Sequence, residues 1–287
     1  MLAVTIAAIS LVLLGSCSDG SDNPEITNTV ASQAESTQST QQPTQPPPPS
    51  TVEPAASPVA LQISVLEERD HDPKAFTQGL EFDDGRLYES RGRNGESGIS
   101  EIDPRDGSVL RWTPLGDEYF GEGVTVVGDS LIQLTWLAGK AFVYDMESFE
   151  VTGSFDYEGQ GWGLCFDGVR LVMSDGSSSL TMRDPETFTV VDSVPVRLDG
   201  SSVASLNELE CVNEKVYANI WQTDTIVEIN PSTGDVTAVI DASGLLDDVN
   251  RAGADVLNGI AYDEASGAFL LTGKLWPSMF VVVFEPS

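Results

Sequence analysis

A short phrase that recurs five times constrains the fold of this chain more than any other feature. In each copy a Gly or Asn lies beside an aliphatic residue that begins a predicted strand, and a turn and a second strand follow. The copies span residues 77–88, 121–132, 161–172, 206–217 and 257–268. We align them on Gly79, Gly123, Gly163, Glu208 and Gly259. The steps between these positions are 44, 40, 45 and 51 residues, which is the period of one four-stranded propeller blade per repeat. The sequence therefore predicts an all-β, five-bladed β-propeller.

A second signature supports this count. Asx-Pro turns follow three of the phrases, at 102–107, 183–188 and 229–234, and a weaker version occupies 144–149. The fifth repeat ends at 280–284 with no further strand behind it. We therefore expect the N-terminal strand near 60–66 to complete the last blade and close the ring. An open array of β-sandwich sheets is the alternative, although repeats that cannot bury a face alone usually close into a ring.

The N-terminus looks like an export signal. Residues 2–15 are uncharged and mostly apolar, too short for a comfortable transmembrane helix, and they run into Leu14-Gly-Ser-Cys17. This ending resembles a bacterial lipoprotein box, which predicts a signal peptide over 1–17 and lipid on Cys17. No Lys or Arg precedes the apolar run, so an ordinary cleaved signal or a chance apolar terminus remains the alternative. We expect an exported cell-envelope lipoprotein, on the periplasmic or extracellular face.

Composition separates a tether from a folded domain. Residues 18–58 are rich in Ser, Thr, Gln and Pro, and such a segment cannot bury enough apolar surface to offset its ordering entropy. The remaining segment, 59–287, is long enough for one sizeable all-β domain. We expect this domain to be a monomer that meets a membrane only through the lipid anchor.

The charge balance excludes some partners. The chain has 45 acidic and 14 basic residues and a formal net charge of −31. Nucleic acids and anionic lipids are therefore not expected to bind it. A generic solvated acidic surface explains the charge most simply, and attraction of cationic ligands is the alternative.

Cysteine and histidine are too few for several kinds of site. The chain has three Cys and one His, and neither Cys165 nor Cys211 has a metal-binding C-x-x-C spacing. The repeat alignment places these two Cys on opposite faces of their strands, which predicts no disulfide and makes Cys211 a buried small hydrophobe. His71 alone cannot build a His-based triad or a multi-His zinc site.

The starts of the innermost strands are the candidate site. In a propeller these positions converge on one mouth of the central channel. Here they are Phe76, Gln78, Phe120, Glu122, Trp162, Asn207, Glu208 and Asn258. Close packing of strand starts explains the neighbouring glycines. It does not explain why equivalent positions hold different polar and aromatic residues, so we interpret them as a pocket.

Individual residues indicate the chemistry. Glu122 lies between two glycines behind two aromatic residues, where an apolar wall raises a carboxyl pKa, so it is the candidate general acid/base. Lys274 ends an apolar strand and could stabilise an oxyanion, with a salt bridge at the channel rim as the alternative. Trp136, Trp162 and Trp221 could form an aromatic box, although a single Trp more often belongs to the core.

Eight short blocks follow one another along the chain: Phe76-Thr-Gln-Gly-Leu80, Phe120-Gly-Glu-Gly123, Leu134-Thr-Trp136, Gly161-Trp-Gly163, Leu206-Asn-Glu-Leu-Glu210, Val216-Tyr-Ala-Asn-Ile-Trp221, Leu257-Asn-Gly-Ile260 and Thr272-Gly-Lys-Leu-Trp-Pro277. Together they resemble the signature blocks of the plant and bacterial type of glutaminyl-peptide cyclotransferase. The resemblance implies a five-bladed propeller that cyclises N-terminal glutaminyl residues of peptides or proteins to pyroglutamate and releases ammonia. It implies that Glu122 is the catalytic glutamate. The pocket residues that it implies are Phe76, Gln78, Phe120, Trp136, Trp162, Asn207, Trp221 and Lys274.

This chemistry suits the composition. Glu122 would carry the proton from the amine to the leaving nitrogen, while Lys274 or Asn207 donates to the oxyanion. No cofactor is required, but a structural calcium could bind near Asn207 and Asn258, whose oxygens are the hard ligands it prefers. A metal-dependent, lactonase-like propeller hydrolase and a non-catalytic surface binding propeller are the two alternatives.

Overall fold

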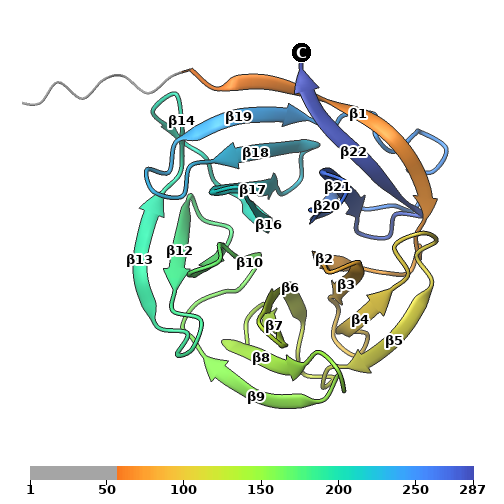
Figure 1. Cartoon of the computed structure of the whole chain (residues 1–287), viewed down its shortest axis with the longest axis vertical. Helices are drawn as coiled ribbons and strands as arrows, with labels where there is room; N and C mark the ends of the chain where they lie inside the picture. Colours follow the sequence, from red (N-terminus) through yellow and green to blue (C-terminus); the bar gives the residue numbers. More distant parts are fainter. Residues whose placement is uncertain (1–56) are drawn as a thin grey trace, which may run out of the picture. The chain divides into compact units, whose positions relative to one another are not determined.

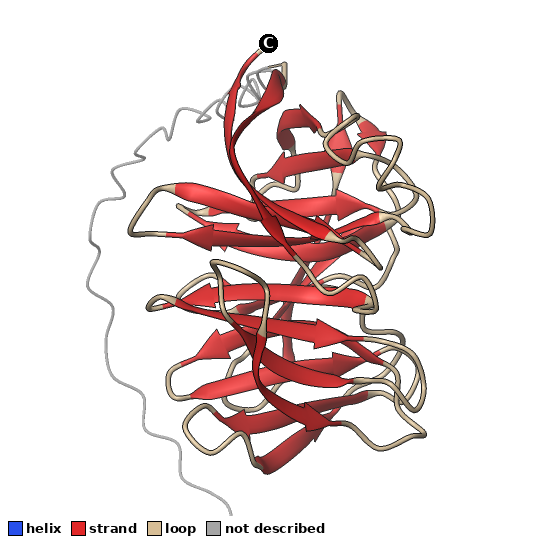
Figure 2. Cartoon of the chain, turned by 90° about the vertical axis from the view of Figure 1, so that its right-hand side faces the viewer, coloured by secondary structure: helices blue, strands red, loops and turns tan. Residues whose placement is uncertain are grey.

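The repeated phrase forms the innermost strand and the first turn of each sheet. The computed structural model describes residues 57–287, and these contain strands, turns and loops but no helix. No membrane-spanning helix is therefore found in that range. The predicted signal peptide, Cys17 and nearly all of the predicted tether lie outside the described residues. The expectation of an all-β fold is confirmed for the described part (Figure 2).

Three antiparallel sheets of four strands follow the order of the chain. Their strands are β2 (Thr77–Asp83), β3 (Arg86–Arg91), β4 (Gly98–Ile102) and β5 (Val109–Pro114); β6 (Gly121–Val127), β7 (Ser130–Thr135), β8 (Lys140–Asp145) and β9 (Val151–Asp156); and β10 (Leu164–Phe166), β11 (Leu171–Met173), β12 (Ser179–Arg183) and β13 (Val190–Pro195). A two-stranded ribbon of β14 (Arg197–Leu198) and β15 (Ser201–Ser202) comes next.

The last eight-stranded sheet joins the two ends of the described chain. Its spatial order is β16 (Leu206–Val212), β17 (Lys215–Ile220), β18 (Thr225–Ile229), β19 (Val236–Asp241), β1 (Val59–Asp70), β22 (Ser278–Pro286), β21 (Ala268–Gly273) and β20 (Leu257–Asp263). The N-terminal strand β1 is antiparallel to β22, with Leu61 opposite Pro286 and Asp70 opposite Ser278. Its first residues also pair in parallel with β19, a contact that the sequence did not predict.

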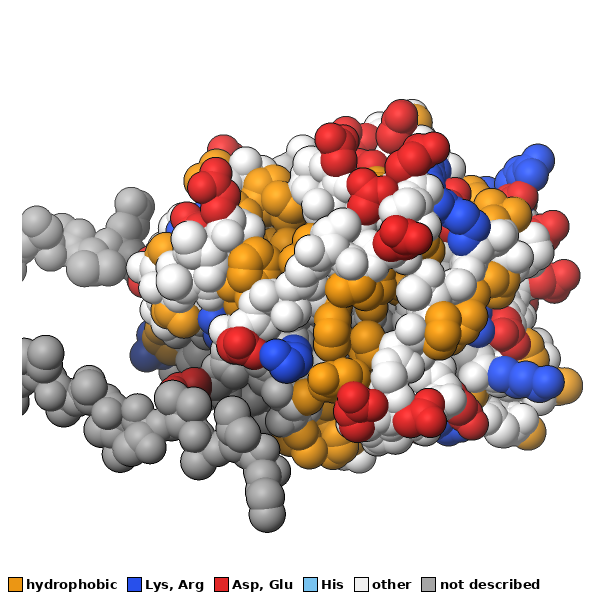
Figure 3. All heavy atoms as spheres, turned by 90° about the horizontal axis from the view of Figure 1, so that it is seen from below, with side chains coloured by type: hydrophobic (Ala, Val, Ile, Leu, Met, Phe, Trp, Pro, Cys, Tyr) orange, Lys and Arg blue, Asp and Glu red, His pale blue; other side chains and the backbone are white. Residues whose placement is uncertain are grey.

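Figure 1 shows how this order is laid out in space. The strands β2, β6, β10, β16 and β20 lie nearest the centre, and the later strands of each sheet follow outward. Exposed apolar side chains on the outer strands include Leu110 of β5, Val151 of β9 and Val190 of β13. Figure 3 shows hydrophobic side chains gathered among acidic ones on one such face. The inner strands, by contrast, are buried over most of their length.

Neighbouring inner strands approach closely at the repeat glycines. A Cβ added to Gly123 would lie 2.7 Å from the Trp162 carbonyl oxygen, and one added to Gly163 would lie 2.1 Å from the Asn207 carbonyl oxygen. The Gly123 amide donates to the Trp162 carbonyl at 2.7 Å. Glycine is therefore required at both positions, because any side chain would push adjacent sheets apart.

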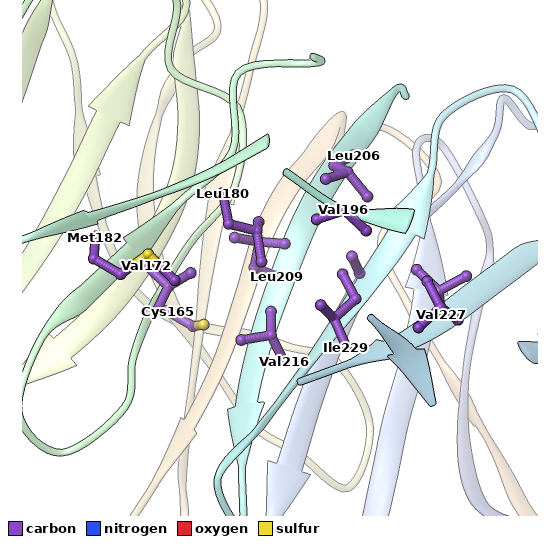
Figure 4. Packing of buried hydrophobic residues seen from close by; sticks show 12 residues of the cluster. Cys165, Val172, Leu180, Met182, Val196, Leu206, Leu209, Val216, Val227 and Ile229 are labelled. Atoms are coloured by element: carbon purple, nitrogen blue, oxygen red, sulfur yellow. The ribbon is translucent and has the colours of Figure 1, made fainter. Parts of the chain in front are cut away.

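Apolar side chains fill the space between the sheets, and one such layer contains a cross-link. Leu180 and Val172 of the third sheet pack against Leu209 and Val216 of the next sheet, as Figure 4 shows. Cys165 of β10 belongs to the same cluster and forms a disulfide with Cys211 of β16, with 5.5 Å between the Cα atoms.

The prediction that these cysteines form no disulfide is therefore wrong, as is the interpretation of Cys211 as a buried small hydrophobe. The repeat alignment placed the two side chains on opposite faces of their own sheets. Adjacent sheets, however, pack face to face, so the back of one sheet meets the front of the next. Because Cys165 and Cys211 lie on opposite faces of their respective sheets, the two side chains point into the same space between these sheets, where the sulfur atoms bond.

Candidate active site

Irregular pairing at the start of the inner strands creates the site. The ladder register shifts between Thr77 and Gly79 and between Gly121 and Val124, and corresponding shifts occur within 206–209 and 257–260. A β-bulge removes residues from the ladder and can re-aim a side chain. The residues inside these four bulges include Gln78, Glu122, Asn207, Glu208 and Asn258. The variable residues of the repeat are therefore the ones that leave regular pairing.

Glu122 is the buried carboxyl group of this region. It is only 5% exposed, and Gln78 Nε2 donates to Glu122 Oε1 at 3.2 Å. Burial raises the pKa of Glu122 well above its ordinary value, and the positive charge of Lys274 partly opposes that rise. A carboxyl group whose pKa is raised in this way can both accept and donate a proton during a reaction.

Lys274 is the second buried ionisable group. It follows β21 directly, and its backbone is fixed by hydrogen bonds with Asp255 and Val256. Burial lowers the pKa of Lys274, and the charges of Glu122 and Asp255 oppose that fall only in part. Among the described residues its ammonium forms no ion pair within 4.0 Å. The alternative of a salt bridge at the channel rim is therefore not observed, and Nζ lies 5.1 Å from the centre of the Phe76 ring.

Aromatic rings form the walls beside these groups. Phe120 contacts Phe76 with 6.2 Å between ring centres and contacts Trp136 with 5.6 Å. Trp162 and Trp221 meet edge to face at 5.5 Å. Trp136 and Trp221 are 38% and 39% exposed, so neither is the core residue that a single Trp more often is. The five rings instead line an open surface next to the bulges.

A residue that the sequence did not suggest, Gln160, joins the group of three rings to the pair formed by Trp162 and Trp221. Gln160 Oε1 accepts hydrogen bonds from Trp136 Nε1 at 2.7 Å and from Trp162 Nε1 at 3.0 Å. The Gly161 amide also donates to the Trp136 carbonyl, which fixes the loop that carries Gln160. One amide oxygen therefore orients two indoles that belong to different sheets. The only signal in the sequence was its place two residues before Trp162.

Replacement of Gln160 by Ala is expected to raise KM about two- to tenfold with a smaller change in kcat. Each lost hydrogen bond contributes roughly 0.5–1.5 kcal/mol, and the indoles would lose their fixed orientation. Gln160→Glu keeps an acceptor oxygen in place and is expected to restore KM. Steady-state kinetics with the Gln-initiated peptide that the sequence resemblance implies as substrate measures both variants, and equal KM values for Gln160→Ala and wild type would contradict this role.

The three asparagines near the channel differ in their partners. Asn258 Nδ2 donates to the carbonyl oxygens of Thr77 and Gln78 at 3.1 and 3.3 Å, which ties β20 to β2. Asn219, which the sequence did not single out, accepts from the Gly259 amide at 3.1 Å. Asn207 Oδ1 and Asn258 Oδ1 are buried without a hydrogen-bond partner among the described residues. These oxygens are free to accept a donor or to face a cation, which fits the donor chemistry of calcium.

Glu208 has a structural role in this arrangement. Its two carboxylate oxygens accept from the amides of Leu80 at 3.3 Å and Ile260 at 2.8 Å. It thus links β16, its own inner strand, to β2 and β20, the inner strands of the first and last repeats. Glu122 has no such backbone donors, so it remains the carboxyl group that is free for chemistry.

A buried ionic network supports the strand that carries Phe76 and Gln78. His71 Nδ1 lies 2.8 Å from the Trp276 carbonyl oxygen and Nε2 lies 2.9 Å from Glu89 Oε1. The Trp276 carbonyl and the ionised Glu89 carboxylate have no hydrogen to donate, so each accepts a hydrogen bond from the ring. Both ring nitrogens of His71 therefore donate, and the ring is an imidazolium. Thr77 Oγ1 and Arg91 Nε also donate to the Glu89 carboxylate, at 2.6 and 2.8 Å.

The His71 part of this network is expected to stabilise the fold in mildly acidic solution, where Glu89 with its pKa lowered to about 2 stays ionised, and to stabilise it less at high pH. Burial alone would lower the pKa of His71, but the charge of Glu89 and its hydrogen bond raise it above 6.5. The contribution is therefore complete below the unfolded pKa of about 6.5 and is lost as pH rises through the raised native pKa. His71 is the single histidine of the chain, so NMR titration of its ring measures the native value directly. A native pKa below 6.5 would contradict this assignment.

A large cavity lies away from these residues. It has a volume of about 1090 Å³ and is lined by the other ends of the inner strands and the turns that follow them, with Glu81 and Asp83 of β2 and Glu210 of β16 among the lining residues. None of the predicted pocket residues lines it. The candidate active site is the mouth of the central channel that holds Glu122. The opposite mouth of the channel is lined by many acidic side chains.

Three comparisons with known proteins bear on this site. A family model described as glutamine cyclotransferase matches residues 29–284. A glutaminyl-peptide cyclotransferase of Arabidopsis thaliana is 42% identical over 227 residues, which cover 77% of this chain and 71% of that protein. The crystal structure of Myxococcus xanthus glutaminyl cyclase superposes with a TM-score of 0.73 at 37% identity, covering 80% of this chain and 100% of that one.

Proposed function

The chain belongs to the glutamine cyclotransferase family, and from this premise we propose how it acts. It converts the N-terminal glutaminyl residue of a peptide or protein to pyroglutamate and releases ammonia, as an aminoacyltransferase. The observation that supports this most directly is the buried Glu122 carboxyl group, held by Gln78 beside Lys274 and a wall of aromatic rings.

Glu122 carries the proton in the proposed reaction. The α-amine of the substrate attacks the carbon of its own γ-amide, so one C–N bond forms and a tetrahedral oxyanion results. Glu122 accepts the proton that the amine loses and delivers it to the amide nitrogen, whose C–N bond then breaks to release ammonia. The raised pKa of Glu122 suits a group that must first accept and then donate. Gln78 holds the carboxyl group in place for both steps.

Lys274 and the aromatic rings prepare the substrate. The unpaired ammonium of Lys274, or the amide of Asn207, donates to the developing oxyanion, and burial strengthens this interaction. A nearby buried cation also favours the neutral form of the α-amine, which is the form that can attack. The rings of Phe76, Phe120 and the three Trp hold the glutaminyl side chain curled against its own amine, which reduces the entropy lost in ring closure.

Mass spectrometry of a Gln-initiated peptide incubated with the purified domain tests the function. We expect the mass to fall by that of one ammonia, with ammonia appearing in solution in equal amount. A mass that stays constant at high enzyme concentration would overturn the assignment. The matched control peptide begins with Asn, whose shorter side chain cannot form the same ring.

The arrangement of the sheets around this site is proposed to be a closed, five-bladed ring. In this reading β1 supplies the outer strand of the blade formed by β20, β21 and β22. Its antiparallel pairing with β22 and the central position of the five inner strands in Figure 1 support the proposal. Deletion of residues 59–66 would then expose β22 and destabilise the whole domain; unchanged stability would contradict it.

We also propose that the protein is exported and anchored through lipid on Cys17, with the domain acting as a monomer. The disulfide between Cys165 and Cys211 supports export, because disulfides persist in oxidising compartments. Fractionation of cells that produce Cys17→Ala tests the anchor. The variant should move to the soluble fraction, and its retention in the membrane fraction would contradict a lipid anchor on Cys17.

No metal is needed for the proposed chemistry, because Glu122 and Lys274 supply the proton transfer and the charge. A structural calcium near Asn207 and Asn258 is compatible with their unpartnered oxygens. Chelator treatment should therefore leave turnover intact, and elemental analysis of the treated protein reports any structural ion. Complete loss of activity with chelator would instead favour the metal-dependent hydrolase alternative.

A further inference from the structure

Arg93 lies at the outer edge of the candidate pocket. Its guanidinium stacks on the Phe76 ring, with 4.4 Å between Cζ and the ring centre. The Lys274 ammonium contacts the same ring at 5.1 Å. Lys274 is buried and Arg93 is partly exposed, so the Phe76 ring contacts one buried cation and one cation that solvent reaches.

The guanidinium of Arg93 has unused donors. Contact with an aromatic ring does not use the N–H groups of a guanidinium, which remain available as the planar fork of donors that matches a carboxylate. Within residues 57–287 this side chain donates no hydrogen bond and joins no ion pair. Most of the other Lys and Arg residues are paired with carboxylates, so this cation is unusual in an acidic protein.

The backbone fixes Arg93 in this place. Its φ is 80°, a left-handed conformation that normally favours glycine. The Arg93 carbonyl accepts from the Glu96 amide at 2.9 Å and from Ser97 Oγ at 2.7 Å. On either side, the Gly92 amide donates to the Phe76 carbonyl and Asn94 Nδ2 donates to the Glu118 carbonyl. The loop is thus tied to the pocket wall with Arg93 in a strained conformation, as residues at binding sites often are.

The charge around Arg93 is positive, whereas the protein as a whole is strongly negative. A net charge of −31 disfavours anions over most of the surface, and the opposite mouth is lined by carboxylates. Arg93 and Lys274 place two cations on one aromatic ring at the substrate mouth. An anionic group that reaches this mouth therefore meets the one pair of unpaired cations beside the pocket.

We infer that Arg93 forms a carboxylate-binding subsite for the part of the substrate just behind the glutaminyl residue. This inference rests on the proposed function and adds a substrate preference to it. The carboxylate can be the side chain of an acidic second residue or the C-terminal carboxylate of a dipeptide. Both fit the same fork of N–H donors, so the experiment must separate them.

The test compares kcat/KM for peptides that differ in one group. C-terminally amidated peptides beginning Gln-Glu, Gln-Gln and Gln-Lys report on the side chain, and a Gln-initiated dipeptide as free acid and as amide reports on the terminus. We expect wild type to prefer Glu over Gln at the second position, or the free acid over the amide, by about two- to tenfold. In Arg93→Gln that ratio should fall to about one, and in wild type it should fall as salt rises.

Two further variants make the result specific. Arg93→Lys keeps the charge but not the planar fork, so its ratio should lie between those of wild type and Arg93→Gln. Arg197→Gln removes the same charge from an exposed position on β14, at the outer rim in Figure 1, and should leave the ratio unchanged.

Three outcomes would overturn the inference, and they can be told apart. Turnover by Arg93→Gln with the wild-type ratio removes the subsite but leaves the proposed function. Failure of wild type to cyclise any of these peptides removes the proposed function and the subsite together. A salt-independent preference in wild type also counts against Arg93, and this measurement does not depend on the folding of a variant.

Discussion

Glu122→Gln is expected to lower ammonia release from a Gln-initiated peptide by about a hundred- to ten-thousand-fold, the range lost with a general acid/base. The amide is nearly isosteric with the carboxyl group and can still contact Gln78, but it cannot take a proton from the amine. KM should change little, because the aromatic rings that bind the side chain stay in place. A coupled assay for ammonia measures the loss, and activity within a few-fold of wild type would remove Glu122 from the role.

A matched control distinguishes chemistry from burial. Glu81 is a half-buried carboxyl group of β2, and loss of hydration is the largest cause that raises its pKa to about 8. It lines the opposite cavity and not the candidate pocket. Glu81→Gln therefore makes the same chemical change in a similar environment, and it should leave kcat within about twofold of wild type.

The pH profile provides a second reading of the same residue. Since Glu122 must be ionised to accept the amine proton, kcat/KM should rise with pH through its raised pKa. This rise is the acidic limb of the pH profile. Lys274 lowers the pKa of Glu122, so Lys274→Met should move the acidic limb to higher pH as well as reduce the rate. The limb should be missing from the residual activity of Glu122→Gln. A wild-type limb at the ordinary glutamate pKa of about 4.3 would contradict the environment described for Glu122.

Removal of the disulfide is expected to have the second large effect, on stability. Cys165 and Cys211 are 46 residues apart, and closing a loop of that length contributes about 4 kcal/mol in the chain-entropy model. The double variant Cys165→Ala/Cys211→Ala should therefore unfold roughly 8–16 °C below wild type, for a domain of this size. Scanning calorimetry measures the shift, and ammonia release at low temperature should stay near the wild-type rate.

Reductant serves as the control for this prediction. It should lower the Tm of wild type toward that of the double variant and leave the variant unchanged. Equal Tm values for wild type and variant would show that the cross-link adds nothing to stability. A fall in the variant on addition of reductant would point to a different cause, since its two linked sulfur atoms are gone.

Much of the site was predictable because the repeats can be aligned. The alignment identified the positions at which inner strands begin, and their variation directed attention to Glu122, Gln78 and Asn207. The bulges now explain why those residues differ, because they lie outside the regular ladder. Lys274 and the exposed Trp136 and Trp221 were identified from their places at strand ends.

The sequence by itself determined the all-β character, the repeated inner strand and the residues that begin it, since each depends on local periodicity and turn chemistry. Only the tertiary structure decided the Cys165–Cys211 disulfide, the bridge from Gln160 to two indoles and the position of Arg93 over Phe76. The physical reason is that these contacts join different sheets or loops. A pattern along one strand shows which face a side chain takes, but the packing of neighbouring sheets sets which other face it meets.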